Sequence, residues 1–366
     1  MHGLSKMVSQ RKLVYLTLTT VALTMISLGA TEIALRIYHY LHPVFIFYDD
    51  SYYRFRGKPF ARYWDFRLNS RGFHDVEFTE KENSTYRILG IGDSFAYGAV
   101  PHGQNYLTLL GARLREDRFN VEVLNMGIPS TGPKEYLALL LREGLTLQPD
   151  MVLLSFFVGN DFTDSQRRWS PRRWYTYSYV ASLVHYILVT RRKYDQRLAQ
   201  KETSYCDDCP FFEPATYLQI ERTRSSIYLG EDQTWIKLLQ DSMFYLKEIK
   251  QICRTRNIDF QVVIIPDEVQ VNSSLQTQVR SMLPDELQKK WNVTFPIDQF
   301  TAALREAKIG YIDLFPQFLE AAKVRTLYKP RDSHWNMAGN RLAAEIIAHN
   351  IRRHLEQIAM KKLPAS

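Results

Sequence analysis

The chain has 366 residues, of which 45% are hydrophobic and 23% charged, so it is long enough to bury one large core or two ordinary ones. This composition excludes a disordered or collagen-like chain, and three cysteines are too few for a disulfide-stapled fold or a usual four-ligand zinc site. The net charge of +8 permits an anionic partner, such as a nucleic acid, an acidic polysaccharide or phospholipid head groups, without selecting among them.

The first distinctive element is an uncharged apolar stretch over residues 13–31, close to the ~20 residues that a helix needs to cross a bilayer. Basic residues and no acidic one precede it, so the positive-inside rule predicts a cytoplasmic tail over residues 1–12 and an extracytoplasmic, periplasmic location for the rest. The alternatives are the buried helix of a soluble protein and a cleaved signal peptide, for which Ser27-x-Gly29 is a poor cleavage site. We therefore expect a single-pass protein of the cell membrane.

Residues 32–85 are predicted to be a juxtamembrane segment, after which short β-branched runs alternate with helical patterns. This alternation is typical of a parallel sheet with helices on both faces, so the predicted fold class is α/β with about five strands within residues 86–358. The predicted strands are 87–91, 121–126, 151–157, 260–265 and 311–314. The predicted helices are 105–116, 134–146, 235–256, 299–308 and 338–354.

About 100 residues separate the third and fourth predicted strands, far more than a connection needs, so residues 162–233 are predicted to be a helical insertion. Its basic, Trp-containing part could be a lid, a membrane-surface contact, a polyanion-binding face or an ordinary solvated face. Cys206 and Cys209 could form a small structural disulfide, two free thiols or a redox site. Cys253 is interpreted as a small buried hydrophobic residue of a helix.

Polar residues follow the predicted strands, at the edge where open α/β sheets place their ligands. Ser94 follows the first strand in a Gly-Asp-Ser sequence and is a candidate nucleophile, with an ordinary helix N-cap as its alternative role. A loop with Gly127 and Gly132 follows the second strand and leads into a helix whose N-terminal amides would face the same edge. Asn160 follows the third strand in a Gly-Asn-Asp sequence.

An acid and an imidazole return to this edge near the C-terminus, in the segment Asp332-Ser-His334. A serine hydroxyl is a weak nucleophile at neutral pH, so His334 would take the Ser94 proton and later donate it to a leaving alcohol. Asp332 would hold the imidazole tautomer and stabilise the imidazolium. The Ser94 amide, a glycine amide and the Asn160 side chain would supply hydrogen-bond donors for the oxyanion. The chain order Ser, Asp, His matches that of α/β-hydrolases, although their G-x-S-x-G elbow is absent.

Together these motifs resemble the SGNH (GDSL-like) hydrolase superfamily: GDS around Ser94, the N-x-G-x-x-x-x-G loop, GND around Asn160 and the D-x-H near the end. The superfamily often has D-x-x-H, and the D-x-H-W-N block here is similar to membrane-anchored relatives of exopolysaccharide O-acetylation. The resemblance implies a flavodoxin-like three-layer α/β/α fold. The residues that it implies are the nucleophile Ser94, the base His334, the orienting acid Asp332, and an oxyanion hole of Ser94, Asn160 and Gly132, with Gly127 as the alternative to Gly132.

The function that the resemblance implies is a membrane-anchored serine ester hydrolase that acts on an extracytoplasmic O-acyl ester through an acyl-enzyme. The alternatives are an O-acyltransferase acting on cell-surface polysaccharide and a non-catalytic envelope assembly protein. The expected partners are an O-acylated small molecule or glycan and the membrane. No nucleic acid is expected, because base-stacking motifs are absent.

No metal or cofactor is expected, because His102 and His185 lack ligand partners at usable spacing. Asp267 and Glu268 follow the fourth predicted strand and could line the crevice at the sheet edge. We interpret them as polar residues of a turn.

Overall fold

The computed structural model describes residues 2–41, 56–165 except 58 and 65, 174–190 and 205–362. The chain divides into two compact units, which are described separately: residues 1–54 with 168–200, and residues 55–167 with 201–366. The predicted insertion therefore contributes to both units. Parts of it, residues 166–173 and 191–204, lie outside the described residues and include most of its basic stretch.

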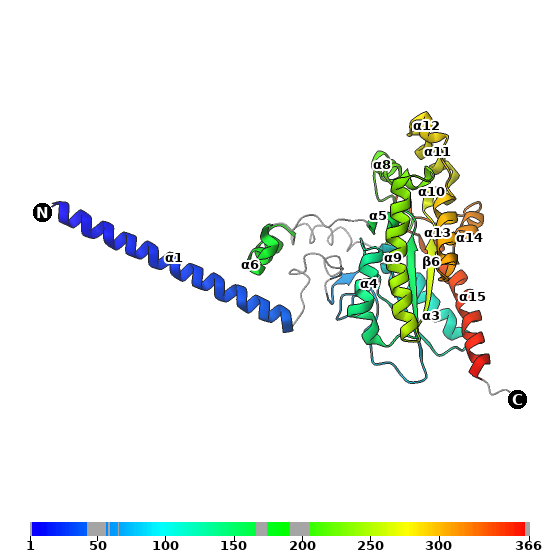
Figure 1. Cartoon of the computed structure of the whole chain (residues 1–366), viewed down its shortest axis with the longest axis horizontal. Helices are drawn as coiled ribbons and strands as arrows, with labels where there is room; N and C mark the ends of the chain where they lie inside the picture. Colours follow the sequence, from blue (N-terminus) through cyan, green and yellow to red (C-terminus); the bar gives the residue numbers. More distant parts are fainter. Residues whose placement is uncertain are drawn as a thin grey trace. The chain divides into compact units, whose positions relative to one another are not determined.

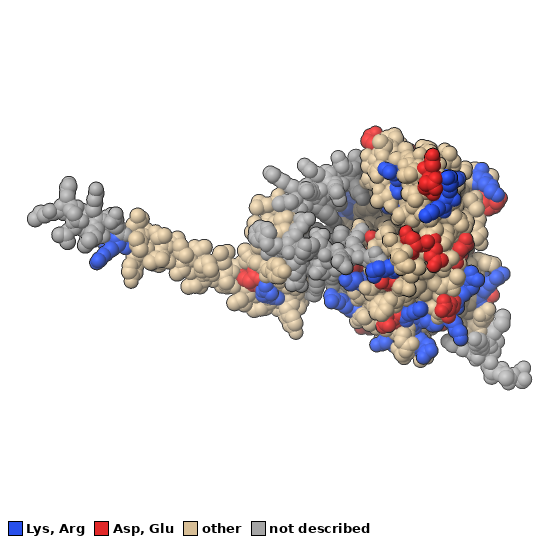
Figure 2. Space-filling model, turned by 45° about the horizontal axis from the view of Figure 1, so that its top comes forward, with Lys and Arg blue, Asp and Glu red and all other residues tan. Residues whose placement is uncertain are grey.

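The first unit contains a long N-terminal helix, α1 (His2–Leu41), and a short helix, α6 (Tyr179–His185), with single turns η5 (Trp174–Tyr177) and η6 (Tyr186–Thr190) on either side of α6. Residues Arg11–Leu41 of α1 are long and apolar enough to cross a membrane, and their most apolar window is fully exposed. Figure 2 shows charged side chains near the two ends of this stretch and none in the part between them. A single N-terminal apolar helix is thus confirmed. Its length and composition fit both a membrane anchor and a signal sequence.

Glu32 joins the two helices of the first unit. Its carboxylate accepts hydrogen bonds from Ser178 Oγ at 2.8 Å, from Tyr179 N at 2.9 Å and from Val180 N at 3.0 Å. These amides belong to the first turn of α6, where helices leave N–H groups without partners. Arg36, one turn along α1, pairs with the same carboxylate at 2.7 Å. The polar end of α1 therefore caps α6.

The second unit is built on a five-stranded parallel sheet with the order β4-β3-β5-β6-β7. Its strands are β3 (Tyr86–Ile91), β4 (Val121–Asn125), β5 (Met151–Phe157), β6 (Asp259–Ile265) and β7 (Gly310–Asp313). All seven residues of β5 are buried, which explains its continuous apolar sequence. The five predicted strands are confirmed, with limits that differ by one residue at most. The chain reverses direction across the sheet at β3, so the carboxyl end of β3 is a topological switch point.

Helices cover both faces of this sheet (Figure 1). On one face α3 (Tyr106–Glu116) packs with α15 (Met337–Lys362), and on the other α4 (Pro133–Arg142) and α13 (Phe295–Glu306) pack with α9 (Gln233–Thr255). The three-layer α/β/α fold class is thereby confirmed. The predicted helix 134–146 ends earlier, because Glu143 leaves helical geometry with φ −131° and the chain continues as the 3-10 turn η4 (Gly144–Leu147).

Short elements complete the second unit. They are the hairpin of β1 (Arg62–Tyr63) and β2 (Phe66–Arg67), then α2 (Ser94–Tyr97), η3 (His102–Gln104), α5 (Asp161–Asp164), α8 (Pro214–Arg224), η7 (Ser225–Tyr228), α10 (Glu268–Val271), α11 (Ser273–Ser281), α12 (Asp285–Gln288) and α14 (Phe315–Ala321). Cys253 of α9 is a buried free cysteine, and burial raises the pKa of its thiol to about 12. Its predicted role as a small buried residue is confirmed.

Candidate active site

Ser94 is the first residue of α2, a one-turn helix at the switch point after β3. The side chain of Asp93 caps this turn by accepting a hydrogen bond from Phe95 N at 2.9 Å, and Ser94 Oγ lies 3.4 Å from the same carboxylate. The turn ends at Gly98, whose φ is +91° and where a Cβ would lie 2.3 Å from Asn105 Nδ2. Only glycine fits there, so the chain turns sharply enough to leave the Ser94 side chain partly exposed at the sheet edge.

Three buried side chains hold the carbonyl end of α2. Asn125 and Asn105 both donate from Nδ2 to the Ala96 carbonyl, at 2.7 and 2.9 Å, and the His74 ring nitrogen Nδ1 lies 2.8 Å from the Tyr97 carbonyl. Buried carbonyls need such partners, so the position of the Ser94 turn is determined by its surroundings. Sequence analysis missed these supporting residues, although Asn125 belongs to the glycine-containing loop that it singled out.

Asp332 and His334 lie in a tight loop closed by an antiparallel bridge between Tyr328 and Trp335. The His334 ring nitrogen Nδ1 is 2.6 Å from Asp332 Oδ1, and the His334 backbone N–H donates to the same oxygen at 3.2 Å. Burial raises the pKa of Asp332, but the charge and hydrogen bonds of His334 outweigh burial and leave the pKa below its ordinary value. An ionised Asp332 accepts a hydrogen bond from Nδ1–H, which leaves Nε2 as the nitrogen that can act as a base.

The imidazole lies next to the nucleophile turn. The ring centroids of His334 and Phe95 are 5.3 Å apart, and Trp335 packs edge-on against Phe95 at 5.0 Å. Phe95 directly follows Ser94 in α2. The structure therefore brings Ser94, Asp332 and His334 to one edge of the sheet.

Asn160 caps the short helix α5 after β5, but its side chain makes no capping hydrogen bond. Its Oδ1 atom is buried and has no hydrogen-bond partner among the described residues, whereas the predicted oxyanion role would use the amide N–H groups of Nδ2. The next residue fixes the backbone here, because Asp161 accepts hydrogen bonds from Phe157 N and Tyr136 Oη, both at 3.0 Å. Burial, reinforced by the nearby charge of Asp93, raises the pKa of Asp161 well above its ordinary value.

The two candidate glycines of the oxyanion hole have backbone N–H groups that are already engaged. Gly132 N donates to Glu135 Oε2 at 3.1 Å, and Gly127 N donates to Asn125 Oδ1 at 2.8 Å. Gly127 also packs so closely on α2 that a Cβ would lie 2.2 Å from its backbone. Ser130, between the glycines, has a left-handed φ of 61°. For either glycine to bind an oxyanion, its N–H must exchange partners when substrate binds, and the choice between them stays a prediction.

A polar network that sequence analysis missed adjoins the His334 loop. Arg224, the last residue of α8, donates from Nη1 to Ser333 Oγ at 2.5 Å and to Glu221 Oε1 at 3.1 Å, and its guanidinium lies 5.7 Å from the ring centre of Phe157. Glu221 is fully buried, and the Arg224 charge compensates it in part. Ser333 was visible in the motif, but no local pattern marks Arg224 as its partner.

Asp267 and Glu268 are also part of this buried region. Asp267 is fully buried and accepts a hydrogen bond from Tyr228 Oη at 3.2 Å, while Tyr217 Oη donates to Glu268. Burial raises the pKa of Glu268 to about 7. Asp267 is the N-cap of α10, in keeping with its interpretation as a polar residue of a turn, but it is buried, since α8 and η7 supply tyrosines that bond with Asp267 and Glu268.

An open pocket of about 580 Å³ lies along α8. It is lined by Ala215, Thr216, Gln219, Ile220, Thr223 and Arg224. Arg224 connects this pocket to Ser333, the residue between Asp332 and His334. The pocket therefore adjoins the candidate catalytic loop and offers mostly apolar and neutral polar contacts.

Residues 230–365 match the family described as the SGNH hydrolase-like domain of acetyltransferase AlgX. The matched part contains Asp332 and His334, whereas Ser94 and Asn160 precede it. This match confirms, over residues 230–365, the resemblance to the SGNH hydrolase superfamily found in the sequence, and the five-stranded α/β/α fold agrees with it.

Solved structures with a similar fold include three hydrolases of low sequence identity. They are the acetyl xylan esterase AlAXEase (15% identity, TM-score 0.40, covering 72% of this chain and 99% of that one), a lipase/acylhydrolase from Enterococcus faecalis (14%, 0.37, 74% and 96%) and a two-domain esterase active on acetylated mannans (11%, 0.40, 74% and 49%). No curated protein sequence matches this chain.

Proposed function

We propose that this protein is a membrane-anchored serine ester hydrolase that acts outside the cytoplasm on an O-acyl ester. The observation that carries the proposal is the 2.6 Å contact between His334 and Asp332, next to the turn that begins with Ser94. Nucleophile, base and orienting acid in this order are the parts that acyl transfer through a serine requires.

The first half of the proposed reaction forms an acyl-enzyme. His334 Nε2 takes the proton of Ser94 Oγ as this oxygen attacks the ester carbonyl, and Asp332 stabilises the resulting imidazolium. The Asn160 amide and a backbone N–H of the Ser94 turn stabilise the oxyanion. When the tetrahedral intermediate collapses, the imidazolium gives its proton to the leaving alcohol. In the second half, water attacks the acyl-enzyme by the same proton transfers and releases the acid.

The alternative proposal is an O-acyltransferase acting on cell-surface polysaccharide. It is supported by the match of residues 230–365 to a family whose description names the acetyltransferase AlgX. The chemistry differs only in the second half, where a sugar hydroxyl replaces water as the attacking group. The pocket along α8 is our proposed place for the substrate beyond its ester group, because Arg224 connects it to the catalytic loop.

Incubation of the full-length protein in detergent with p-nitrophenyl acetate, with and without oligosaccharide acceptors, tests both proposals. A hydrolase releases one acetate for each nitrophenol in either condition. A transferase gains turnover from the acceptor, and mass spectrometry finds the acetyl group on the sugar. No turnover, together with no labelling of Ser94 by a fluorophosphonate, would instead favour a non-catalytic envelope assembly protein.

Replacing Asn160 with alanine should lower kcat by roughly 10²–10³-fold and leave KM nearly unchanged, because an oxyanion donor acts on charge that develops only near the transition state. Steady-state kinetics on p-nitrophenyl acetate check this expectation. The matched control is Asn120→Ala, a surface asparagine whose Nδ2 bonds with Ser84. An Asn160→Ala effect confined to KM would show that Asn160 holds substrate and is not an oxyanion donor.

The N-terminal helix is proposed to be an uncleaved membrane anchor with its N-terminus in the cytoplasm. In support, α1 runs without a break from His2 to Leu41 through the poor cleavage site at Ser27. The protein should keep its N-terminus and stay in the membrane fraction after an alkaline carbonate wash, which removes proteins held only by charge. A reporter fused after residue 60 should work only if it functions outside the cytoplasm. A soluble protein with a new N-terminus near Ala30 would contradict the anchor.

A further inference from the structure

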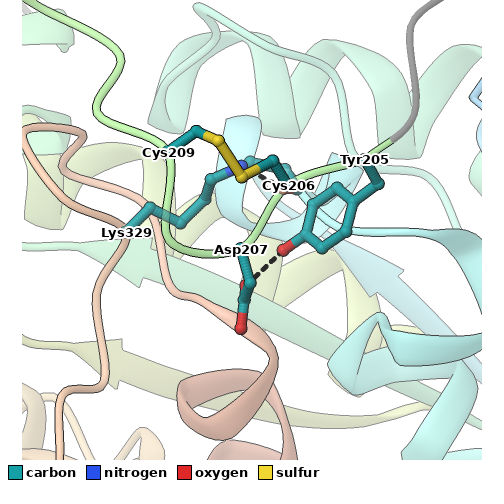
Figure 3. The surroundings of a disulfide bond; sticks show 6 residues. Tyr205, Cys206, Asp207, Cys209 and Lys329 are labelled. Carbon is teal, nitrogen blue, oxygen red and sulfur yellow. Dashed lines mark hydrogen bonds between the residues drawn. A yellow bond between two sulfur atoms is a disulfide. The ribbon is translucent and has the colours of Figure 1, made fainter.

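A disulfide between Cys206 and Cys209 closes a small loop that lies beside Lys329 (Figure 3) and bonds with residues on either side of Asp332 and His334. We propose that this loop, through Asp207, positions His334 for catalysis, so that full activity requires the closed disulfide. The loop belongs to the predicted insertion. Of the three roles left open for Cys206 and Cys209, the structure has the structural disulfide. The inference rests on the proposed esterase function.

Asp207 caps the helix that directly follows the catalytic segment. Its two carboxylate oxygens accept the N–H of Met337, the first residue of α15, at 3.0 and 3.3 Å. A carboxylate at a helix N-terminus both satisfies an unpaired amide and interacts favourably with the helix dipole. Tyr205 Oη donates to Asp207 and so orients it, as the dashed line in Figure 3 shows. This cap fixes the chain on the C-terminal side of His334.

The residues that follow the disulfide loop hold the chain on the N-terminal side of Asp332. Phe211 N donates to the Pro330 carbonyl and Phe212 N to the Arg331 carbonyl, both at 3.2 Å. Lys329 extends toward the disulfide loop in Figure 3, with Nζ 4.7 Å from the ring centre of Tyr205. Residues 205–212, which include the disulfide loop, therefore contact the chain on both sides of Asp332 and His334.

The disulfide restrains Asp207 in the position from which it caps α15, because Asp207 lies between the two cysteines. Opening the bridge gives the loop conformational freedom that the cap must then overcome. Closing it takes two electrons and two protons from the thiols, which a disulfide oxidant such as oxidised glutathione accepts as it becomes two thiols. Since thiols stay reduced in the cytoplasm, the enzyme would become fully active only after export to an oxidising compartment.

The cap is tested with Asp207→Ala in the full-length protein in detergent. Because a small displacement of a catalytic base is costly, kcat for p-nitrophenyl acetate should fall about tenfold or more while KM changes little. Asp207→Asn should restore most of kcat, since asparagine caps a helix as well as aspartate does. Asp208→Ala is the matched control, because Asp208 is the exposed neighbour of Asp207. Equal kcat values for Asp207→Ala and Asp208→Ala would overturn the proposal.

The disulfide is tested with dithiothreitol and with the Cys206→Ser/Cys209→Ser double variant. Dithiothreitol should lower kcat of the wild type, and oxidised glutathione should restore it. The double variant should have the lower kcat from the start and should not respond to dithiothreitol. Cys253→Ala should respond like the wild type, which excludes the buried free thiol as the cause.

Two further measurements distinguish a failure of the proposed function from a failure of the proposed role of the disulfide loop. Thermal unfolding of each variant shows whether the domain still folds, and only variants that do are compared in kcat. A wild type without turnover or Ser94 labelling would overturn the proposed function itself. An active wild type with a fully active, folded double variant would overturn only the positioning role of the disulfide loop.

Discussion

Replacing Ser94 with alanine is expected to lower ester cleavage by 10³-fold or more, because the nucleophile is the member of the triad that forms the covalent intermediate. The backbone of α2 should be unaffected, since Asn125 and Asn105 hold the Ala96 carbonyl and Asp93 caps the turn. The variant should therefore unfold at nearly the wild-type temperature. Steady-state kinetics and a thermal melt check both parts of this expectation.

A matched serine variant separates the nucleophile from a general effect of losing a hydroxyl. Ser226 lies exposed in η7, so Ser226→Ala should keep wild-type turnover. Fluorophosphonate labelling gives a second readout, because it needs the activated hydroxyl and no substrate. If Ser94→Ala retained more than about a tenth of the activity, Ser94 would be an ordinary N-cap residue and the nucleophile would lie elsewhere.

Replacing Asp332 with asparagine should lower kcat by about 10³–10⁴-fold, because an asparagine amide can hold the imidazole in the wrong tautomer. His334→Ala should cause a loss of similar size, since the two residues act as one unit. A His334→Ala loss of less than about tenfold, beside a full Ser94→Ala loss, would show that His334 is not the base.

Asp332 should also make stability depend on pH. Its pKa is lowered in the folded protein by His334 despite burial, so the folded state favours the ionised form. This contribution is fully present above the unfolded pKa of about 3.9 and is lost as the pH falls through the lower folded value. Urea unfolding of the wild type and of Asp332→Asn between pH 2 and 7 should show a smaller acid-induced loss in the variant. Parallel pH profiles would contradict an ionised Asp332 in the folded protein.

The sheet could be predicted from the sequence because buried parallel strands are short apolar runs, and β5 is buried along its whole length. Ser94, Asn160 and the pair Asp332 and His334 were found for a related reason. Ser94 and Asn160 follow β3 and β5 closely, Asp332 and His334 come after the last strand and before the last helix, and the carboxyl ends of parallel strands all lie at one edge of the sheet. Order along the chain was therefore enough to place these residues at one edge of the sheet, and their catalytic roles stay a prediction.

Contacts between distant segments could not be predicted in this way. Arg224 reaches Ser333 across 109 positions and Asp207 reaches Met337 across 130, and no local periodicity specifies such pairs. The same holds for Gly132, whose N–H looked available in the sequence and is engaged by Glu135 in the fold.

By itself, the sequence determined the order of strands and helices along the chain, the apolar N-terminal helix and the candidate residues for the sheet edge, because these depend on hydrophobic pattern and position along the chain. The tertiary structure decided which hydrogen-bond partners these residues have and at which distances. Whether Cys206 and Cys209 form a bridge, and whether Asp207 between them caps α15, depends on the docking of a segment whose own sequence carries no regular pattern. Such docking is specified by the shape and polar groups of the surface that receives the segment, and this surface exists only after the chain has folded.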